Sequence, residues 1–241
     1  MSLALDILAQ TPNTLFQQAS YRNIVSLIAS EDLFDDLTDD PNDYPLAHTL
    51  EALHTPPHYS HHAPIINRPF EESAWFNAIT FPFEHWQESR YSQGRFGVWY
   101  GASDLKTTLY ETAFHWVKRT FQEENDLPEG RTIERKVYTV QLNALMLDLR
   151  PILHQYPALQ ASNDYSLTQQ IGYAMHQQGH PGLITQSARC TGDVQVVFNR
   201  QVLSEPRVNQ WLRYTLNNNT VEATTPDGRV MEIISTQLLL G

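Results

Sequence analysis

The sequence predicts an α+β protein with a mixed or largely antiparallel sheet and flanking helices. Strand-like segments outnumber helical ones, and the two do not alternate regularly as they would in a parallel α/β fold. No internal repeat or clear linker divides the 241 residues, a length that can bury the core of a single domain. We therefore expect one domain over residues 21–241, preceded by an N-terminal extension over residues 1–20.

The first quarter of the chain offers few regular elements. Apolar residues at helical spacing predict a short helix from Leu3 to Leu8. The acidic run from Glu31 to Asp40 predicts a solvated helix, with Ser30 as its N-cap and Pro41 beyond its end. The segment from Pro56 to Pro69 is rich in proline and histidine, which predicts an irregular loop.

A strand and a helix are predicted in the middle of the chain. Gly97 to Gly101 is apolar with a glycine at each end, as in a buried strand. Ser103 is expected to cap a helix that runs to about Thr120, because apolar residues recur there at helical spacing. Glu111 and His115 lie four residues apart and therefore on one face of this helix.

The second half of the chain is predicted to be mainly strands. Alternating or short apolar runs indicate strands at 136–142, 145–149, 183–185, 195–198 and 211–216. One helix interrupts them, capped by Asn163 or Asp164 and ended by Gly179 after Gln178. Turn-forming residues at 217–219 and 226–228 are expected to join the last strands.

Composition limits the classes of function and the compartment. The formal net charge of −11 argues against direct nucleic-acid binding, although clustered arginines could still hold a small anion. The only cysteine, Cys190, cannot form an intramolecular disulfide, which fits a reducing compartment. The N-terminus lacks the pattern of a secretory signal, and no segment approaches the ~20 apolar residues that cross a bilayer. We expect a cytoplasmic protein that does not bind membranes.

Standard nucleotide and metal motifs are missing from the sequence. Gly94-Arg95-Phe96-Gly97 fits neither a P-loop nor the glycine turn of dinucleotide-binding folds. The spacing of His54, His58, His61 and His62 matches no zinc pattern, so we expect a surface loop and no metal site. A nucleotide bound here would need another scheme.

Arginines, aromatic residues and one acid surround the predicted middle strand. Arg90 and Arg95 precede it, Tyr100 ends it and Glu111 follows on the predicted helix. Guanidinium groups match phosphate oxygens, a tyrosine ring can stack on a flat group, and a carboxylate can stabilise a sugar cation. Taken singly, such residues more often serve as surface or ion-pairing groups.

These motifs in their order resemble the RES-domain family, which is named for an arginine, a glutamate and a serine. The resemblance spans about Tyr21 to Tyr214, and Gln186 stands where many members have proline. Its segments are Tyr21–Ser26, Ser89–Gly94, Gly97–Ser103, Leu109–Thr112, Asp164–Tyr165, Gln169, Gly182–Arg189 and Val196–Phe198. Matched by position, the three family residues are Arg22, Glu111 and Ser187.

The resemblance implies a fold similar to that of ADP-ribosyltransferases, and a reaction on NAD⁺. Members are typically toxins of bacterial toxin–antitoxin pairs with an Xre-like antitoxin, and they consume NAD⁺ by hydrolysis or phosphorolysis. NAD⁺ would then be a substrate, with no permanently bound cofactor. The residues expected to bind it, besides Glu111 and Ser187, are Arg22, either Arg90 or Arg95, Tyr100, Tyr91 and Tyr21.

Several functions stay open from the sequence. Nicotinamide leaves NAD⁺ as a neutral molecule, so one carboxylate, Glu111, could suffice to stabilise the sugar cation. The acceptor of the sugar could be water, inorganic phosphate held by Arg189 or His115, or a protein side chain, as in an ADP-ribosyltransferase. A non-catalytic binding module is a further alternative, against which the retained Arg22, Tyr100 and Glu111 argue.

Overall fold

The computed structural model describes residues 3–26 and 73–240. These residues build an eight-stranded sheet with the strand order β1-β4-β7-β6-β5-β8-β9-β10. In this sheet β5 and β6 run parallel, and the other neighbours run antiparallel. The predicted mixed, largely antiparallel α+β class is confirmed. The helix predicted at 31–40, the loop at 56–69 and the four-histidine group lie outside the described residues.

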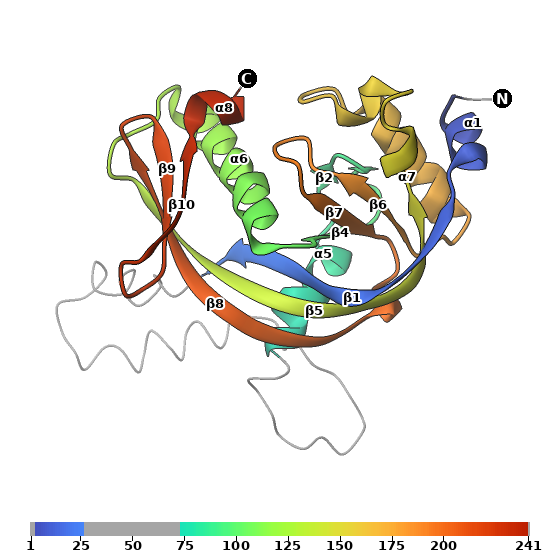
Figure 1. The fold of residues 1–241 in the computed structure, drawn as a ribbon, viewed down its shortest axis with the longest axis horizontal. Helices are drawn as coiled ribbons and strands as arrows, with labels where there is room; N and C mark the ends of the chain where they lie inside the picture. The colour runs from blue at the N-terminus through green and yellow to red at the C-terminus, as the bar shows by residue number, and fades with distance from the viewer. Residues whose placement is uncertain (1–2, 27–72, 241) are drawn as a thin grey trace, which may run out of the picture.

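Three long strands form a curved band along one side of the molecule (Figure 1). They are β1 (Asn13–Val25), β5 (Thr132–Asp148) and β8 (Leu203–Asn217). β1 pairs with β5 along its whole length, from Asn13 opposite Leu147 to Val25 opposite Arg135. The boundary predicted after residue 20 therefore falls inside β1, and residues 13–20 are part of the sheet.

β5 also joins two segments that the sequence predicted as separate strands. The buried Leu142, Ala144 and Met146 alternate with exposed residues, so the pleat continues without a break through residues 143–145. The end of the predicted second strand, Leu149, lies just beyond β5.

The shorter strands complete the sheet. They are β4 (Trp99–Ala102), β6 (Gly182–Gln186), β7 (Asp193–Val197), β9 (Thr220–Thr224) and β10 (Val230–Ser235). Both predicted turns near the end are present, with Asn218, Asn219 and Gly228 in the left-handed region. A separate hairpin is formed by β2 (Glu88–Ser89) and β3 (Ser92–Gln93).

The longer helices α6 (Leu105–Glu124) and α7 (Ser166–Gln177) stand over the concave side of the band (Figure 1). The shorter ones are α1 (Leu3–Gln10), η2 (Phe76–Thr80), α5 (Phe81–Glu84), η3 (Arg150–Ile152), η4 (Pro157–Gln160), η5 (Arg200–Val202) and α8 (Thr236–Leu240). The helix predicted near Leu3 is thus observed. No described helix combines the length and apolar character needed to cross a membrane.

Capping residues differ slightly from those predicted. Asp104, and not Ser103, caps α6, because its carboxylate accepts hydrogen bonds from the Thr107 backbone N–H at 2.7 Å and the Thr107 hydroxyl at 2.8 Å. The Ser103 hydroxyl accepts instead from Gln195 Nε2 at 2.7 Å. At α7, Asp164 Oδ1 accepts from the Ser166 backbone N–H at 2.9 Å, one position earlier than a true N-cap.

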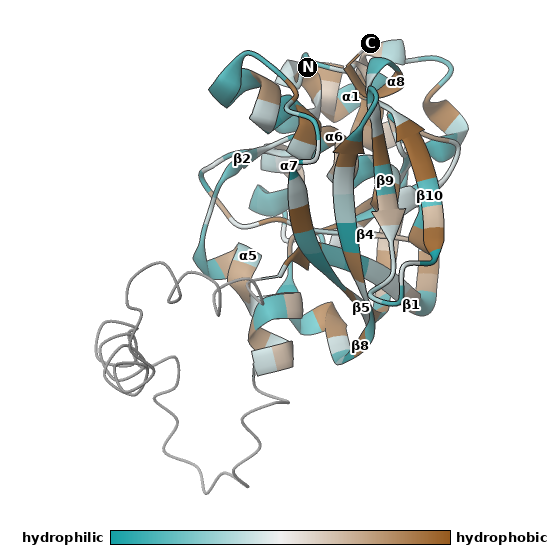
Figure 2. Ribbon diagram, turned by 90° about the vertical axis from the view of Figure 1, so that its left-hand side faces the viewer, coloured by the Kyte–Doolittle hydropathy of each residue, from teal (hydrophilic) through white to brown (hydrophobic). Residues whose placement is uncertain are grey.

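The two longer helices belong to different parts of the core. Leu109, Ala113 and Val117 of α6 pack with β8 and β9, whereas Ile171 and Met175 of α7 pack in a different apolar cluster with β6 and β7. A third cluster lies around η2, β4 and β5. Figure 2 shows the apolar residues interleaved with polar ones along the strands.

Candidate functional site

A cavity of about 780 Å³ lies between α6 and the β2–β3 hairpin. Residues of β1 and β4 line its inner part, and the loop after β6 lines another wall. The predicted residues that line it are Tyr21, Arg22, Arg90, Tyr91, Tyr100, Glu111 and Ser187. Segments that lie far apart in the chain therefore meet at one place, as the RES-like order implied.

Arg95 does not line this cavity, in contrast to Arg90. Gly94 adopts a φ of +77°, and the chain then buries Phe96 against the ring of His176, with 4.2 Å between ring centroids. Arg95 lies between these two residues and is exposed. The choice that the sequence left open between the two arginines is therefore decided by backbone geometry, in favour of Arg90 as the cavity residue.

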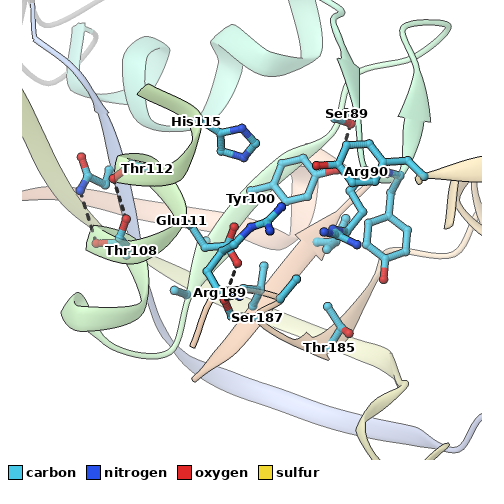
Figure 3. Close-up of a pocket in the computed structure, with 18 of the residues that line it drawn as sticks. Ser89, Arg90, Tyr100, Thr108, Glu111, Thr112, His115, Thr185, Ser187 and Arg189 are labelled. Atoms are coloured by element: carbon cyan, nitrogen blue, oxygen red, sulfur yellow. Dashed lines mark hydrogen bonds between the residues drawn. The ribbon is translucent and has the colours of Figure 1, made fainter. Parts of the chain in front are cut away.

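Glu111 and Ser187 are in direct contact (Figure 3). The Ser187 hydroxyl donates to Glu111 Oε1 at 2.5 Å, and it accepts from the backbone N–H groups of Arg189 at 3.0 Å and Cys190 at 3.2 Å. Only 4% of Ser187 is exposed. Ser187 therefore holds the carboxylate of Glu111 in a defined place, since two N–H groups already occupy its oxygen.

The loop that carries Ser187 is fixed against the start of α6. The Ser187 backbone N–H donates to the Gly192 carbonyl at 2.8 Å and closes the loop. A Cβ atom on Gly192 would collide with the side chain of Thr107, so glycine permits this close approach. The distance between the loop and the helix bearing Glu111 is thus set by the contact of Gly192 with the Thr107 side chain.

Arg22 reaches the cavity from β1. Its Nη1 donates to the Tyr100 carbonyl at 2.9 Å, and its guanidinium lies 5.6 Å from the centre of the Trp99 ring. Its Nε is buried without a hydrogen-bond partner among the described residues. Burial, and then the charge of Arg135, lower the pKa of Arg22 to about 10. Arg22 is still a cation at neutral pH.

Arg90 and Arg189 are held in a similar manner by carbonyls and aromatic rings. Arg90 donates to the Ala161 carbonyl at 2.9 Å, and its guanidinium lies 4.6 Å from the centre of the Tyr165 ring. Arg189 donates to the Ser162 carbonyl at 2.8 Å and lies 3.4 Å from the centre of the Phe114 ring. Both side chains are thereby oriented without losing their positive charge.

Of the four arginines that line the cavity, only Arg119 forms an ion pair among the described residues, with Glu123. None of Arg22, Arg90 and Arg189 forms an ion pair with a carboxylate of the described residues, although Glu111 is the largest source of attraction for Arg189. Outside the cavity, ion pairs join Arg131 to Glu124, Arg150 to Asp148 and to Asp193, and Arg213 to Glu134. The cavity thus keeps unneutralised positive charge in a chain whose net charge is −11.

Tyr100 presents its ring to the cavity with its hydroxyl already engaged (Figure 3). That hydroxyl donates to Ser89 Oγ at 2.9 Å and accepts from the Tyr91 backbone N–H at 3.1 Å. Burial raises the pKa of Tyr100 above its ordinary value, so the phenol stays neutral. Tyr91 has 0% exposure and packs in the core, so it offers little surface to a ligand, whereas Tyr21, like Tyr100, is half-buried.

His115 lies one helical turn beyond Glu111 and also lines the cavity. Crowding by surrounding protein atoms, and then the charges of Arg189 and Lys118, lower the pKa of His115 although the residue reaches solvent. The imidazole is therefore neutral at pH 7. The spacing from Glu111 had indicated its position on this face.

The sequence reasoning missed the polar residues that neighbour Arg22 and Glu111. Asn23, Thr108 and Thr112 line the cavity floor and are joined by hydrogen bonds. Their adjacency to the matched residues in the chain was the available signal. Within the described residues, no group of three or more histidine, cysteine or acidic side chains is placed to hold a metal ion.

Comparisons with known proteins identify the family. The RES domain family matches residues 61–217, a range that contains Arg90, Tyr100, Glu111 and Ser187 but not Arg22. No curated protein matches the sequence significantly. Among solved structures, the chain is similar to one described as the M. tuberculosis MbcT–MbcA toxin–antitoxin complex, at 13% identity and a TM-score of 0.46, covering 88% of this chain and 92% of that chain.

Proposed function

The chain belongs to the RES domain family, and from this membership and the cavity we propose that it is an NAD⁺-degrading toxin. The reaction would cleave the bond between nicotinamide and ribose. The observation that carries the proposal is the meeting, in one cavity, of the Ser187-bound Glu111 with three arginines that have no carboxylate partner in the described part of the chain. Its volume of about 780 Å³ is ordinary for a small-molecule site, since such sites span ~300–1,000 Å³.

The charges of the cavity suit the two charged groups of NAD⁺, its pyrophosphate and its nicotinamide ring. The pyrophosphate carries two negative charges, and planar guanidinium groups bind its oxygens in pairs. Arg22 of β1 and Arg90 of the β2–β3 turn are the proposed pyrophosphate ligands. The nicotinamide ring is cationic, and it would lie toward Glu111.

Glu111 would stabilise the ribose cation that forms as nicotinamide departs. This transition state resembles that of glycoside hydrolysis, but the leaving group needs no proton because it leaves as a neutral molecule. A carboxylate already aimed at the anomeric carbon stabilises the developing charge without reorganising. The hydrogen bond from Ser187 supplies this orientation, so we assign Ser187 to positioning Glu111.

Tyr100 would contribute its ring and not its hydroxyl. The hydroxyl is engaged by Ser89 and by the Tyr91 N–H, and it stays protonated. A tyrosine face exposed to the cavity can pack against a flat, cationic ring. Tyr100 is therefore the proposed nicotinamide platform.

Water or inorganic phosphate is the proposed acceptor of the sugar, with Arg189 and neutral His115 lining the space beside Glu111. Family membership also supports an Xre-like antitoxin as partner, a fold similar to that of ADP-ribosyltransferases, and action in the cytoplasm on free NAD⁺. Transfer to a protein side chain is the alternative that the product analysis distinguishes.

The proposal is tested by incubating the purified protein with NAD⁺, with and without phosphate, and identifying products by mass. We expect nicotinamide together with ADP-ribose or its 1-phosphate. Glu111→Gln should reduce the rate at least ~100-fold, because an oriented charge stabilising the transition state is typically worth this much. Arg95→Ala, outside the cavity, should retain the wild-type rate. If the wild-type protein released no nicotinamide, the proposal would be refuted. If labelled NAD⁺ left its label on a protein, the transferase alternative would be favoured.

A further inference from the structure

A chain of hydrogen bonds runs beneath the cavity and joins the neighbours of Arg22 and Glu111. We infer that it is a brace that fixes the position of these two residues relative to each other. The inference rests on the proposed function, because it concerns the reaction for which both residues are needed. The members of the brace are Arg135 of β5, Asn23 of β1, Tyr214 of β8, and Thr112 and Thr108 of α6.

The direction of every proton in this chain follows from Arg135. Its Nε can only donate, and it does so to Asn23 Oδ1 at 2.9 Å, so the other end of that amide is the nitrogen. Asn23 Nδ2 in turn donates to the Tyr214 hydroxyl at 2.9 Å. The Tyr214 proton is then left for Thr112 Oγ1, also at 2.9 Å.

Thr112 closes the sequence on the backbone of its own helix. Its hydroxyl proton goes to the Thr108 carbonyl at 2.6 Å, so its oxygen must accept from Tyr214. The second proton of Asn23 Nδ2 points to Thr108 Oγ1 at 3.4 Å, and that hydroxyl donates to the Leu105 carbonyl at 2.7 Å. The direction of each hydrogen bond in the chain is thus fixed, and the opposite set of donors and acceptors is excluded.

Burial makes these donor and acceptor roles difficult to change. Arg135 is 6% and Tyr214 0% exposed, so water cannot easily replace a lost partner. Arg135 has no carboxylate partner among the described residues, and its Nη2 donates to the Asn23 carbonyl at 3.1 Å. The cation therefore depends on Asn23 for both described hydrogen bonds, which fixes this residue on β1.

The brace bears on catalysis because Arg22 and Glu111 have no described hydrogen bond to each other. Arg22 precedes Asn23 on β1, and Glu111 precedes Thr112 on α6. The contact from Asn23 through Tyr214 to Thr112 therefore sets the spacing between the proposed pyrophosphate ligand and the proposed cation stabiliser. Asn23, Tyr214 and Thr112 are positioning residues in this scheme, and Tyr214 reaches the reaction only through them.

Removing the central hydroxyl tests the brace. Tyr214→Phe keeps the ring in the core and should lower kcat for NAD⁺ about ten- to 100-fold, with KM changed less than about twofold, since small misplacements cost this much. Thr112→Val should have a similar effect. The double variant should be no worse than either single one, because both break the same link. Tyr173→Phe, an exposed change on α7, is the matched control and should behave as wild type.

Asn23→Asp separates positioning from stability. The new carboxylate would pair with buried Arg135 and preserve resistance to urea, but it cannot donate to Tyr214. The Tyr214 hydroxyl would then donate to this carboxylate and no longer to Thr112. We therefore expect kcat to fall while the protein unfolds at the same urea concentration as the wild type. A kcat that follows the unfolding midpoint across these variants would show a structural role only and overturn the inference.

Hydrogen exchange of the ligand-free protein tests the brace without any turnover. Tyr214→Phe should speed amide exchange over residues 105–115 of α6 at least about threefold, whereas Tyr173→Phe should leave it unchanged. Unchanged exchange in Tyr214→Phe would overturn the brace, whatever the activity of the variant. If the wild-type protein releases no nicotinamide, the proposed function fails. If it does and Tyr214→Phe keeps full kcat, the function stands and the brace fails.

Discussion

The oxygen of the Ser187 hydroxyl accepts hydrogen bonds from the backbone N–H groups of Arg189 and Cys190, so the hydroxyl takes part in a further hydrogen bond only as a donor. The proton therefore lies on the line to Glu111. A serine whose oxygen is already hydrogen-bonded twice, and whose proton lies on a carboxylate, has little capacity to act as a nucleophile. We therefore propose that its contribution is to orient Glu111.

Ser187→Ala should therefore slow turnover without abolishing it. Glu111 keeps its charge but gains rotameric freedom, so we expect about a tenfold loss of kcat at similar KM, in line with the loss of one positioning hydrogen bond. Two buried N–H groups also lose their acceptor, which should lower the free energy of unfolding by ~1–3 kcal/mol. Steady-state kinetics and urea unfolding measure the two effects, and a loss as large as that of Glu111→Gln would contradict a positioning role.

Arg22→Lys should impair NAD⁺ binding although the charge is kept. Lysine cannot donate to the Tyr100 carbonyl and present a second planar donor at the same time. We expect KM to rise about tenfold or more, since bidentate charge-assisted hydrogen bonds are roughly twice as strong as neutral ones. Wild-type kinetics in this variant would show that Arg22 is not a pyrophosphate ligand. The match to the RES domain family would be unaffected, because it begins at residue 61 and does not include Arg22.

At the level of elements, the stripe of Leu109, Ala113 and Trp116 was enough to predict α6 and the face on which Glu111 lies. The cap was misplaced by one residue because Ser103 and Asp104 are both good caps. The sequence does not decide between them. In the structure the Ser103 hydroxyl accepts a hydrogen bond from Gln195 and does not cap the helix. β5 was divided in two because Asn143 interrupts the apolar pattern, yet it lies on the exposed side of a continuous strand.

Asp104→Ala should destabilise the protein through α6. The loss of the two hydrogen bonds to Thr107 removes the cap, which typically costs ~0.5–2 kcal/mol in the free energy of unfolding. Asp104→Asn should retain most of the stability, because asparagine caps a helix nearly as well. Urea unfolding of both variants checks this expectation, and equal loss in both would assign the effect to charge instead of capping.

At the level of the whole molecule, the sequence could predict which residue types surround a nucleotide but not which arginine enters the cavity. Arg90 lies in the turn of the β2–β3 hairpin, which lines the cavity, whereas Arg95 follows the turn at Gly94 and is exposed. Nor could spacing reveal that Arg22, Arg90 and Arg189 would contact carbonyls and rings while Arg131, Arg150 and Arg213 pair with acids. The brace of Arg135, Asn23 and Tyr214 depends on three strands and a helix meeting, which no local pattern encodes.

The contrast between an acidic chain and a positive cavity leads to a prediction about salt. Salt screens charges over a distance of ~10 Å at 0.1 M and ~3 Å at 1 M, so the attraction between the cavity and the pyrophosphate should weaken. We expect KM for NAD⁺ to rise several-fold between about 0.05 and 0.5 M sodium chloride, with kcat nearly constant, because Glu111 acts at short range where screening is small. In Arg90→Leu the same titration should give a shallower rise, because one screened cation has gone. Arg95→Ala should retain the wild-type slope, and a KM that is independent of salt would mean that the arginines of the cavity do not bind the anionic part of the substrate.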